Sequence, residues 1–137
     1  MNNHADLCGT LVLVHPELLN DPAEKKNQVG VISSADLEND NVVVSFSDGS
    51  EGLFSTDALM VMRDTDEIRR YADYDVDLLF REDYFDIIAV CMAAEVADLG
   101  GQRAAIQLAS KNPMALEYAM RPLNDELGLN RHKSPAR

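Results

Sequence analysis

Hydrophobic residues follow one spacing before Arg63 and another after it. In residues 42–47, Val42, Val44 and Phe46 occupy alternate positions, which is the period of two typical of a half-buried strand. After Arg63, apolar residues recur at helical spacing with many alanines between them, which favours helix over strand. The change of period predicts an α+β protein in which a sheet precedes a set of helices.

Five short strands are predicted in the first part of the chain. The first ends at Pro16, which has no backbone N–H to donate to a strand ladder. Asp48-Gly49 is a strong hairpin signal, because glycine adopts the positive φ of a tight turn without steric cost. The last strand is apolar on both faces, as in a strand buried on two sides. The predicted strands are residues 9–15, 28–33, 42–47, 51–54 and 59–62.

The longest predicted helix lies in the second part of the chain. Its apolar residues recur at intervals of three and four, so they line one helix face. Gly100-Gly101 is expected to end this helix, because glycine is the usual residue after a helix C-terminus. The residues of the predicted face are Phe85, Ile88, Met92, Val96 and Leu99.

Shorter helices are predicted towards the C-terminus. Residues 102–110 form one, and Pro113 opens another, since proline is tolerated in a first helical turn. Pro122 forbids a continuous helix and predicts a break at Arg121. A short turn of helix stopped by Gly128 should follow the break. Three to four helices are therefore expected in all.

The predicted strands resemble the small SH3-like barrels of the KOW and Tudor type. The resemblance covers residues 9–62 and implies a five-stranded antiparallel barrel of a known interaction fold, packed against the helices. The change of period near Arg63 and the basic C-terminal residues divide the chain into a barrel at residues 1–63, an acidic helical subdomain at 64–129 and a disordered basic tail at 130–137. The matching positions are Gly9-x-x-Val12-x-Val14, Gly30-x-Ile32, Asp48-Gly49 and Asp57-x-Leu59.

The chain of 137 residues is strongly acidic, with a net charge of -12 at pH 7. Three of its 12 basic residues lie in the last eight positions, whereas all 24 acidic residues precede them. Such a surface repels phosphate backbones, so binding to nucleic acid is not expected. Opposite charge speeds encounter, and the expected partner is a protein with a basic surface.

Two further features concern the cellular location. Cys8 and Cys91 form no CxxC pair and lie in apolar surroundings, which favours free thiols in a reducing compartment. The longest apolar stretch, residues 87–99, is interrupted by two acids and is shorter than the ~20 residues of a membrane span. No signal sequence is recognised at the N-terminus. We therefore expect a cytoplasmic protein that does not enter membranes.

The candidate binding site lies in residues 64–86, which hold nine acids and three arginines. Aromatic residues are enriched in interface cores, so the tyrosines of this cluster could anchor a partner among the carboxylates. Alternatively, they could pack between subdomains with the hydroxyl in water. The candidate residues are Tyr71, Tyr74, Tyr84, Asp73 and Asp75.

Asp73-x-Asp75-x-Asp77 copies the first three ligand positions of an EF-hand loop. The pattern then fails, because Leu78 stands in place of the required glycine and Tyr84 in place of the bidentate glutamate. A solvated turn, with acids near a positive helix end, explains these residues better. No metal and no other cofactor is expected.

Enzymatic activity is not expected, because the chain carries none of the familiar catalytic or phosphate-binding motifs. His15, beside Pro16 at a strand end, is the histidine best placed to be rigid. We interpret the chain as an adaptor or interaction module. Two alternatives stay open: a transcription- or translation-associated factor, since a barrel followed by helices is similar in order to CarD-like polymerase-binding regulators, and a small hydrolase or metal-binding protein using His15 or residues 73–77.

Overall fold

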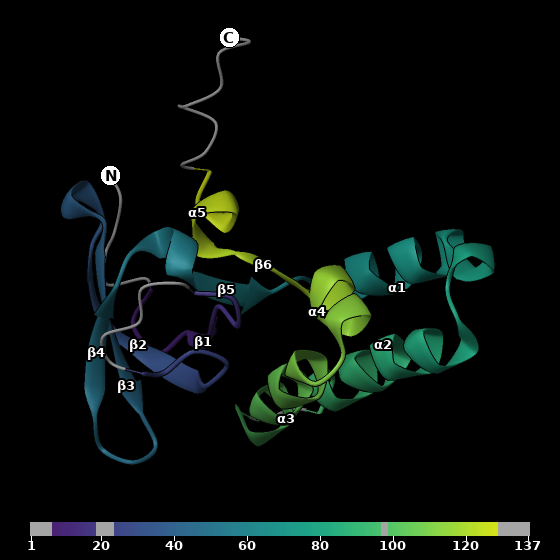
Figure 1. The fold of residues 1–137 in the computed structure, drawn as a ribbon, viewed down its shortest axis with the longest axis horizontal. Coiled ribbons are helices and arrows are strands. Elements are labelled where there is room, and N and C mark those ends of the chain that lie inside the picture. The colour runs from purple at the N-terminus through teal and green to yellow at the C-terminus, as the bar shows by residue number, and fades with distance from the viewer. Residues whose placement is uncertain (1–6, 19–23, 97–98, 129–137) are drawn as a thin grey trace, which may run out of the picture. The chain divides into compact units, whose positions relative to one another are not determined.

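The computed structural model describes residues 7–18, 24–96 and 99–128 and confirms the α+β class (Figure 1). The chain forms two compact units, one made of Met1–Val61 with Pro122–Arg137 and the other of Met62–Arg121. The chain leaves the first unit after Val61 and returns to it at Pro122. The predicted basic tail, 130–137, lies outside the described residues.

A six-stranded sheet has the order β4-β3-β2-β1-β5-β6. Its paired strands from β1 to β5 are antiparallel, and all five predicted strands are present. The sheet is not closed into a barrel, and a sixth strand that the sequence pattern did not predict follows β5 in its order. The SH3-like barrel is therefore not confirmed. The strands are β1 Leu11–Val14, β2 Val29–Asp36, β3 Asn41–Phe46, β4 Glu51–Phe54, β5 Leu59–Met62 and β6 Met120–Pro122.

The core of the first unit consists of alternate residues of its strands. Gly30 of β2 lies opposite Phe46 of β3, and a Cβ atom at position 30 would stand 2.4 Å from Cγ1 of Val44. The rings of Phe46 and Phe54 meet edge to face at 6.2 Å between centroids, a favourable geometry. The cluster consists of Val12, Val14, Ile32, Val42, Val44, Phe46, Phe54, Ala58, Leu59, Val61 and Leu123. Leu59, Met60 and Val61 are all buried, as predicted for β5.

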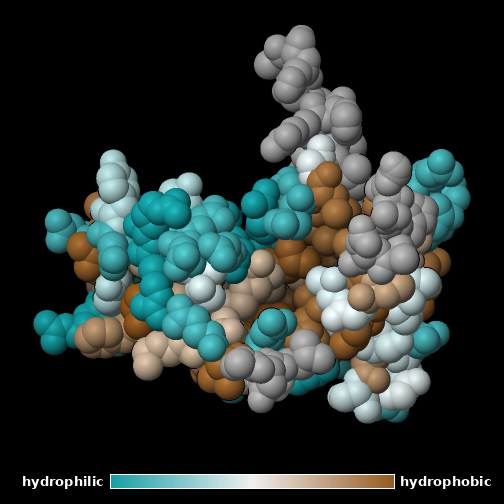
Figure 2. All heavy atoms as spheres, turned by 180° about the vertical axis from the view of Figure 1, so that it is seen from behind, coloured by the Kyte–Doolittle hydropathy of each residue, from teal (hydrophilic) through white to brown (hydrophobic). Residues whose placement is uncertain are grey.

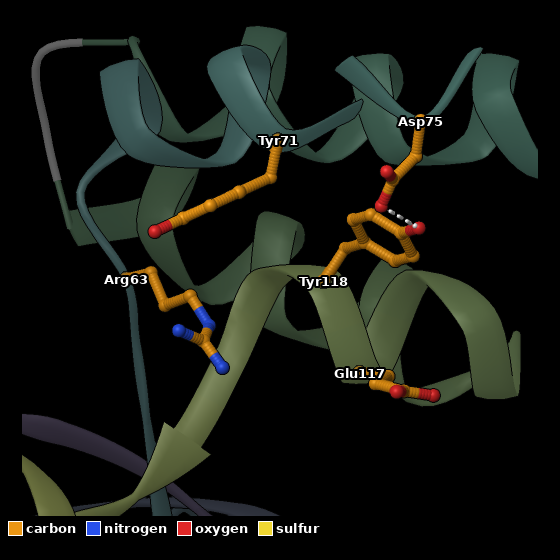
Figure 3. A pocket seen from close by; sticks show the side chains of 5 residues that line it. All are labelled: Arg63, Tyr71, Asp75, Glu117 and Tyr118. Atoms are coloured by element: carbon orange, nitrogen blue, oxygen red, sulfur yellow. Dashed lines mark hydrogen bonds between the residues drawn. The ribbon is translucent and has the colours of Figure 1, made fainter. Parts of the chain in front are cut away.

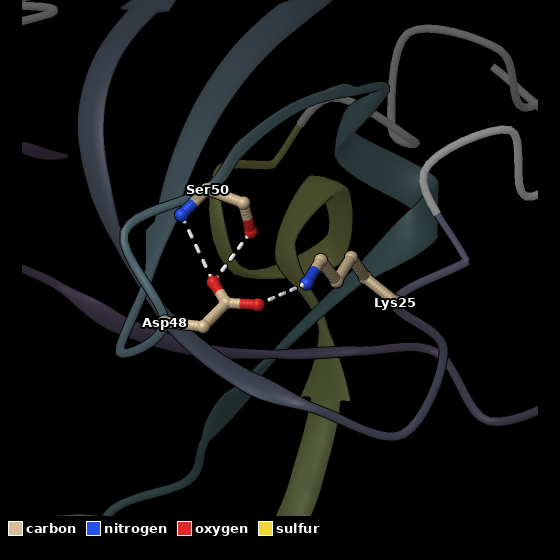
Figure 4. A network of polar contacts seen from close by, with 3 residues as sticks. All are labelled: Lys25, Asp48 and Ser50. Carbon is tan, nitrogen blue, oxygen red and sulfur yellow. Dashed lines mark hydrogen bonds and ion pairs between the residues drawn. The ribbon is translucent and has the colours of Figure 1, made fainter.

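The predicted Asp48-Gly49 turn joins β3 to β4 and is stabilised by a polar network (Figure 4). Gly49 has φ +89°, a backbone conformation that would be strained in a residue with a side chain. One carboxylate oxygen of Asp48 accepts hydrogen bonds from Ser50 N at 2.9 Å and Ser50 Oγ at 2.6 Å, and the other accepts one from Lys25 Nζ at 2.9 Å. These bonds, that from the Ser50 hydroxyl first, hold the pKa of Asp48 well below its usual range.

The second unit is helical and comprises α1 Thr65–Tyr74, α2 Arg81–Ala94, α3 Leu99–Ser110 and α4 Pro113–Ala119. A fifth helix, α5 Leu123–Glu126, belongs to the first unit. Pro113 opens α4 as predicted, and Asn112 caps it by accepting a hydrogen bond from Met114 N at 2.9 Å. The break near Arg121 is also confirmed, since α4 ends before extended residues.

The buried face of α2 is not the one formed by the apolar residues whose spacing predicted the helix. Ile87, Val90 and Cys91 are fully buried, whereas Phe85 and Met92 of the predicted face are 59% and 61% exposed. The helix has apolar residues on two opposite faces, so periodicity alone did not identify the inward one.

The predicted stop at Gly100-Gly101 was wrong, because both glycines lie within α3. A Cβ atom on Gly101 would stand 2.7 Å from Ala93 O and from Val96 Cβ. Glycine at this position therefore allows the start of α3 to approach the end of α2 closely. None of the helices in the described ranges combines the length and the apolar character that a membrane crossing requires.

Candidate functional site

The predicted tyrosines occupy different environments at the junction of α1 and α2. Tyr71 is 48% exposed on α1, and Tyr74, the last residue of α1, is 87% exposed. Tyr84, in the first turn of α2, is half-buried. The residues thus share one region of the second unit, but they do not form a single cluster.

The two predicted aspartates each hold a tyrosine hydroxyl. Tyr84 donates a hydrogen bond of 2.7 Å to Oδ1 of Asp73, which raises the pKa of Tyr84. Tyr118, on α4, donates one of 2.7 Å to Oδ2 of Asp75. Because the two carboxylates have partners on different helices, they tie α1 to α2 and to α4.

Asp73 and Asp75 of the EF-hand-like pattern therefore have tyrosine hydroxyls as partners. Within the described ranges, no three histidine, cysteine or acidic side chains are grouped so as to hold a metal ion. His15 also has a local contact: its Nδ1 accepts a hydrogen bond of 3.1 Å from the backbone N–H of Glu17. Cys8 is exposed, Cys91 is buried, and both are free thiols.

An open pocket of about 290 Å³ lies beside Tyr71 and Asp75, between α1 and α4 (Figure 3). Its other lining residues are Arg63, Glu117 and Tyr118. Two tyrosines and two acids thus surround a space that also admits the Arg63 side chain. The sequence pattern identified Tyr71 and Asp75 as candidates. It did not identify Glu117 and Tyr118 of α4, which lie more than 40 positions further along the chain.

Arg63 enters this pocket from the end of β5. Its backbone N–H donates to Ala119 O at 2.8 Å, and its Nη1 lies 3.7 Å from Oε2 of Glu67. Its Nε is buried and has no hydrogen-bond partner among the described residues. The guanidinium group of Arg63 therefore has few hydrogen-bond acceptors for its N–H groups. The pocket wall carries both positive and negative side chains.

Large apolar side chains in the connection between α1 and α2 are exposed, which the sequence pattern did not predict. Tyr74, Leu78 and Phe80 are 87%, 82% and 77% exposed. The connection contains a 3₁₀ turn at Val76–Leu78 and continues to Phe80, the N-cap of α2. We call Tyr74, Leu78 and Phe80 the turn surface.

The turn surface is surrounded by charge. Asp73, Asp77 and Glu82 alternate with its apolar residues along the chain, and all three are exposed. Figure 2 shows the same kind of mixture on one face of the molecule, where hydrophobic residues in brown reach the surface beside hydrophilic residues in teal. Exposed apolar groups rimmed by polar ones are typical of interaction sites.

Comparison of the chain with family models, curated proteins and solved structures finds no match.

The hydrogen bond between Tyr118 and Asp75 gives a testable pH dependence. It raises the pKa of Tyr118 to about 12, because ionisation would remove the donated proton and place two negative charges together. Since the folded-state pKa lies above the ordinary value of about 10, the stability from this bond is present below pH 10 and lost as the pH rises through about 12. We expect Asp75→Asn to lower the pKa of Tyr118.

The measurement is an ultraviolet titration of tyrosinate, taken as the difference between the protein and its Tyr118→Phe variant. The same difference in an Asp75→Asn background should show ionisation at lower pH. Circular dichroism at each pH checks that the protein remains folded. An unchanged titration in the Asp75→Asn background would show that the carboxylate does not control Tyr118.

Proposed function

We propose that this protein is a cytoplasmic interaction module that binds a basic protein surface through the turn surface and its surrounding carboxylates. The observation that carries the proposal is the exposure of Tyr74, Leu78 and Phe80, each more than three-quarters accessible to solvent. Leaving three large apolar side chains in water costs free energy that a partner would recover by covering them. Aromatic anchors of this kind dominate many interfaces.

The charge of the region supports a basic partner. Residues 64–86 hold nine acids and three arginines, so a partner carrying lysines and arginines would meet a complementary potential. The pocket beside Tyr71 and Asp75 adds a recess in the same unit, and one side chain of the partner would occupy it. The resemblance of residues 9–62 to SH3-like interaction folds is a prediction that agrees with this role.

The test compares proteins captured from a lysate of the source cells by the wild-type chain and by a Tyr74→Ser, Leu78→Ser, Phe80→Ser variant. We expect the wild-type chain to retain basic proteins at low salt, and the triple variant to retain at least tenfold less. Capture should weaken as salt screens the charges. Leu53→Ser is the matched control, because Leu53 is 60% exposed on β4, in the first unit.

The proposal makes two demands on the result. Leu53→Ser must capture the same proteins as the wild-type chain, and the triple variant must retain its helical circular dichroism. Equal capture by the triple variant and the wild-type chain would rule out the turn surface as the binding site. Absence of any salt-sensitive partner would contradict the function itself.

A further inference from the structure

Helix α2 has an outward apolar face along most of its length. At 100° per residue, Phe85, Met92 and Val96 fall on one side, opposite Ile87 and Val90. The first three are 59%, 61% and 53% exposed, whereas the last two are fully buried. We call Phe85, Ile88, Met92 and Val96 the α2 stripe.

The stripe has the spacing of a helix-packing seam. Its residues follow one another at intervals of three, four and four, the pattern by which one helix packs against another. Val96 continues the pattern just beyond α2, where its N–H still bonds Ala93 O at 3.2 Å. Phe85 and Val96 are about 16 Å apart along the axis at 1.5 Å per residue, the length of about three helical turns.

Side chains outside the stripe hold α2 at both ends, and Val96 of the stripe also lies against Gly101 at the start of α3. Near its start, Asn112 Nδ2 donates to Asp83 Oδ1 at 3.1 Å and Asp86 Oδ2 at 2.7 Å. At its end, Arg69 forms two hydrogen bonds with the carboxylate of Glu95, at 2.8 and 3.2 Å. A helix anchored at both ends presents a preorganised surface, so binding to it loses less conformational entropy.

The charges beside the stripe indicate what would cover it. Glu82 and Asp86 are exposed along one side of it, whereas Glu95, on the other side, is already paired with Arg69. A second copy of this chain would bring the same acids and a further net charge of -12 against them. Like charges placed together oppose association, whereas lysines and arginines beside an apolar seam would be attracted to Glu82 and Asp86.

We propose that the α2 stripe is the docking site for an amphipathic helix of a partner protein, with an apolar face bordered by basic residues. Helix recognition fits the seam spacing, and the flexible side chain of Met92 can adapt to the partner's side chains. The inference rests on the proposed function in that the partner is basic. It names a second surface, separate from the turn surface, and the class of secondary structure that binds there.

The experiment uses a synthetic probe on the full chain. The chain contains no tryptophan, so a single tryptophan in a helical Leu–Lys peptide reports binding by fluorescence. We expect the peptide to bind at physiological salt and the Met92→Ser, Val96→Ser variant to bind it at least tenfold more weakly. These substitutions remove apolar surface without adding charge, so electrostatic attraction for the peptide is unchanged. Leu53→Ser, at a 60% exposed position on β4 in the first unit, should bind within twofold of wild type.

Four outcomes would overturn the inference. A Leu–Glu peptide that binds as tightly as the Leu–Lys peptide would exclude charge complementarity. Loss of binding in the turn-surface triple variant but not in the stripe variant would place the helix elsewhere and leave the proposed function standing. If the wild-type chain fails to bind the Leu–Lys peptide but still captures basic proteins through the turn surface, the α2 stripe is not a helix-docking site and the proposed function stands. Self-association in sedimentation that the stripe variant abolishes would make a second copy the occupant.

Discussion

Replacing Ile87 by alanine is expected to lower the free energy of unfolding by about 2–5 kcal/mol, the usual range for truncating a buried isoleucine. Ile87 is fully buried on the inward face of α2, in the second unit. Truncation removes apolar contacts and leaves a cavity that a packed interior fills only in part. Urea denaturation followed by circular dichroism measures the change.

Met92→Ala on the same helix is the matched control. Met92 is 61% exposed on the opposite face, so its truncation should change the free energy of unfolding by no more than about 0.5 kcal/mol. The pair of variants tests which face of α2 is buried, because both remove a large apolar side chain and both introduce a good helix former. A larger loss for Met92→Ala than for Ile87→Ala would reverse the assignment of the faces.

Gly30→Ala is expected to lower the free energy of unfolding by about 1–3 kcal/mol through overpacking. The added Cβ would stand 2.4 Å from Val44 Cγ1 and 3.0 Å from two ring carbons of Phe46. Both neighbours are buried in the core of the first unit, so they cannot move aside without disturbing other packed side chains. Thermal and urea unfolding of the variant provide the measurement.

Ser34→Ala serves as the reference for this variant, since Ser34 lies on the same strand and is exposed. Its effect should stay within about 0.5 kcal/mol. If Gly30→Ala has the same unfolding midpoint as the wild-type chain, β2 and β3 do not approach as closely at Gly30 as the register indicates. In that case Gly30→Val should be tolerated as well. The close contact with Val44 instead predicts that Gly30→Val is strongly destabilised.

The two surfaces suggest how one acidic chain would engage a partner. The turn surface offers short, separate aromatic and aliphatic anchors among carboxylates, and the α2 stripe offers a straight seam. Phe80 is the N-cap of α2 and Phe85 lies in its second turn, so the two surfaces follow one another along the chain. The region that gathers the acids is therefore also the region that exposes the most apolar side chains in the second unit.

Local patterns were sufficient to predict most secondary-structure elements. The alternation at residues 42–47, the Asp48-Gly49 turn, Pro113 and Pro122 act through their own backbone geometry and immediate neighbours. The elements they predicted are β3, its hairpin, the start of α4 and the break after it. Such features depend on few other residues, and so they can be recognised without knowledge of the fold.

Tertiary structure alone decided which surfaces are available. α2 is apolar on two opposite faces, and only the packing of α1, α3 and α4 against it determines which face is buried. Gly100-Gly101 resembles a helix stop, but the close approach at Gly101 explains the glycine there instead. The open six-stranded sheet likewise depends on β6, whose three residues come from the far end of the chain.

The candidate site likewise depends partly on local sequence and partly on tertiary packing. Residues 64–86 were recognised from composition, because acids and tyrosines concentrate there. Composition did not identify Tyr118, which bonds Asp75, or the pocket residues Arg63 and Glu117. Nothing near these residues in the sequence indicates their spatial neighbours. The sequence determined most of the elements and the charge of this protein, whereas long-range packing decided which apolar side chains remain exposed.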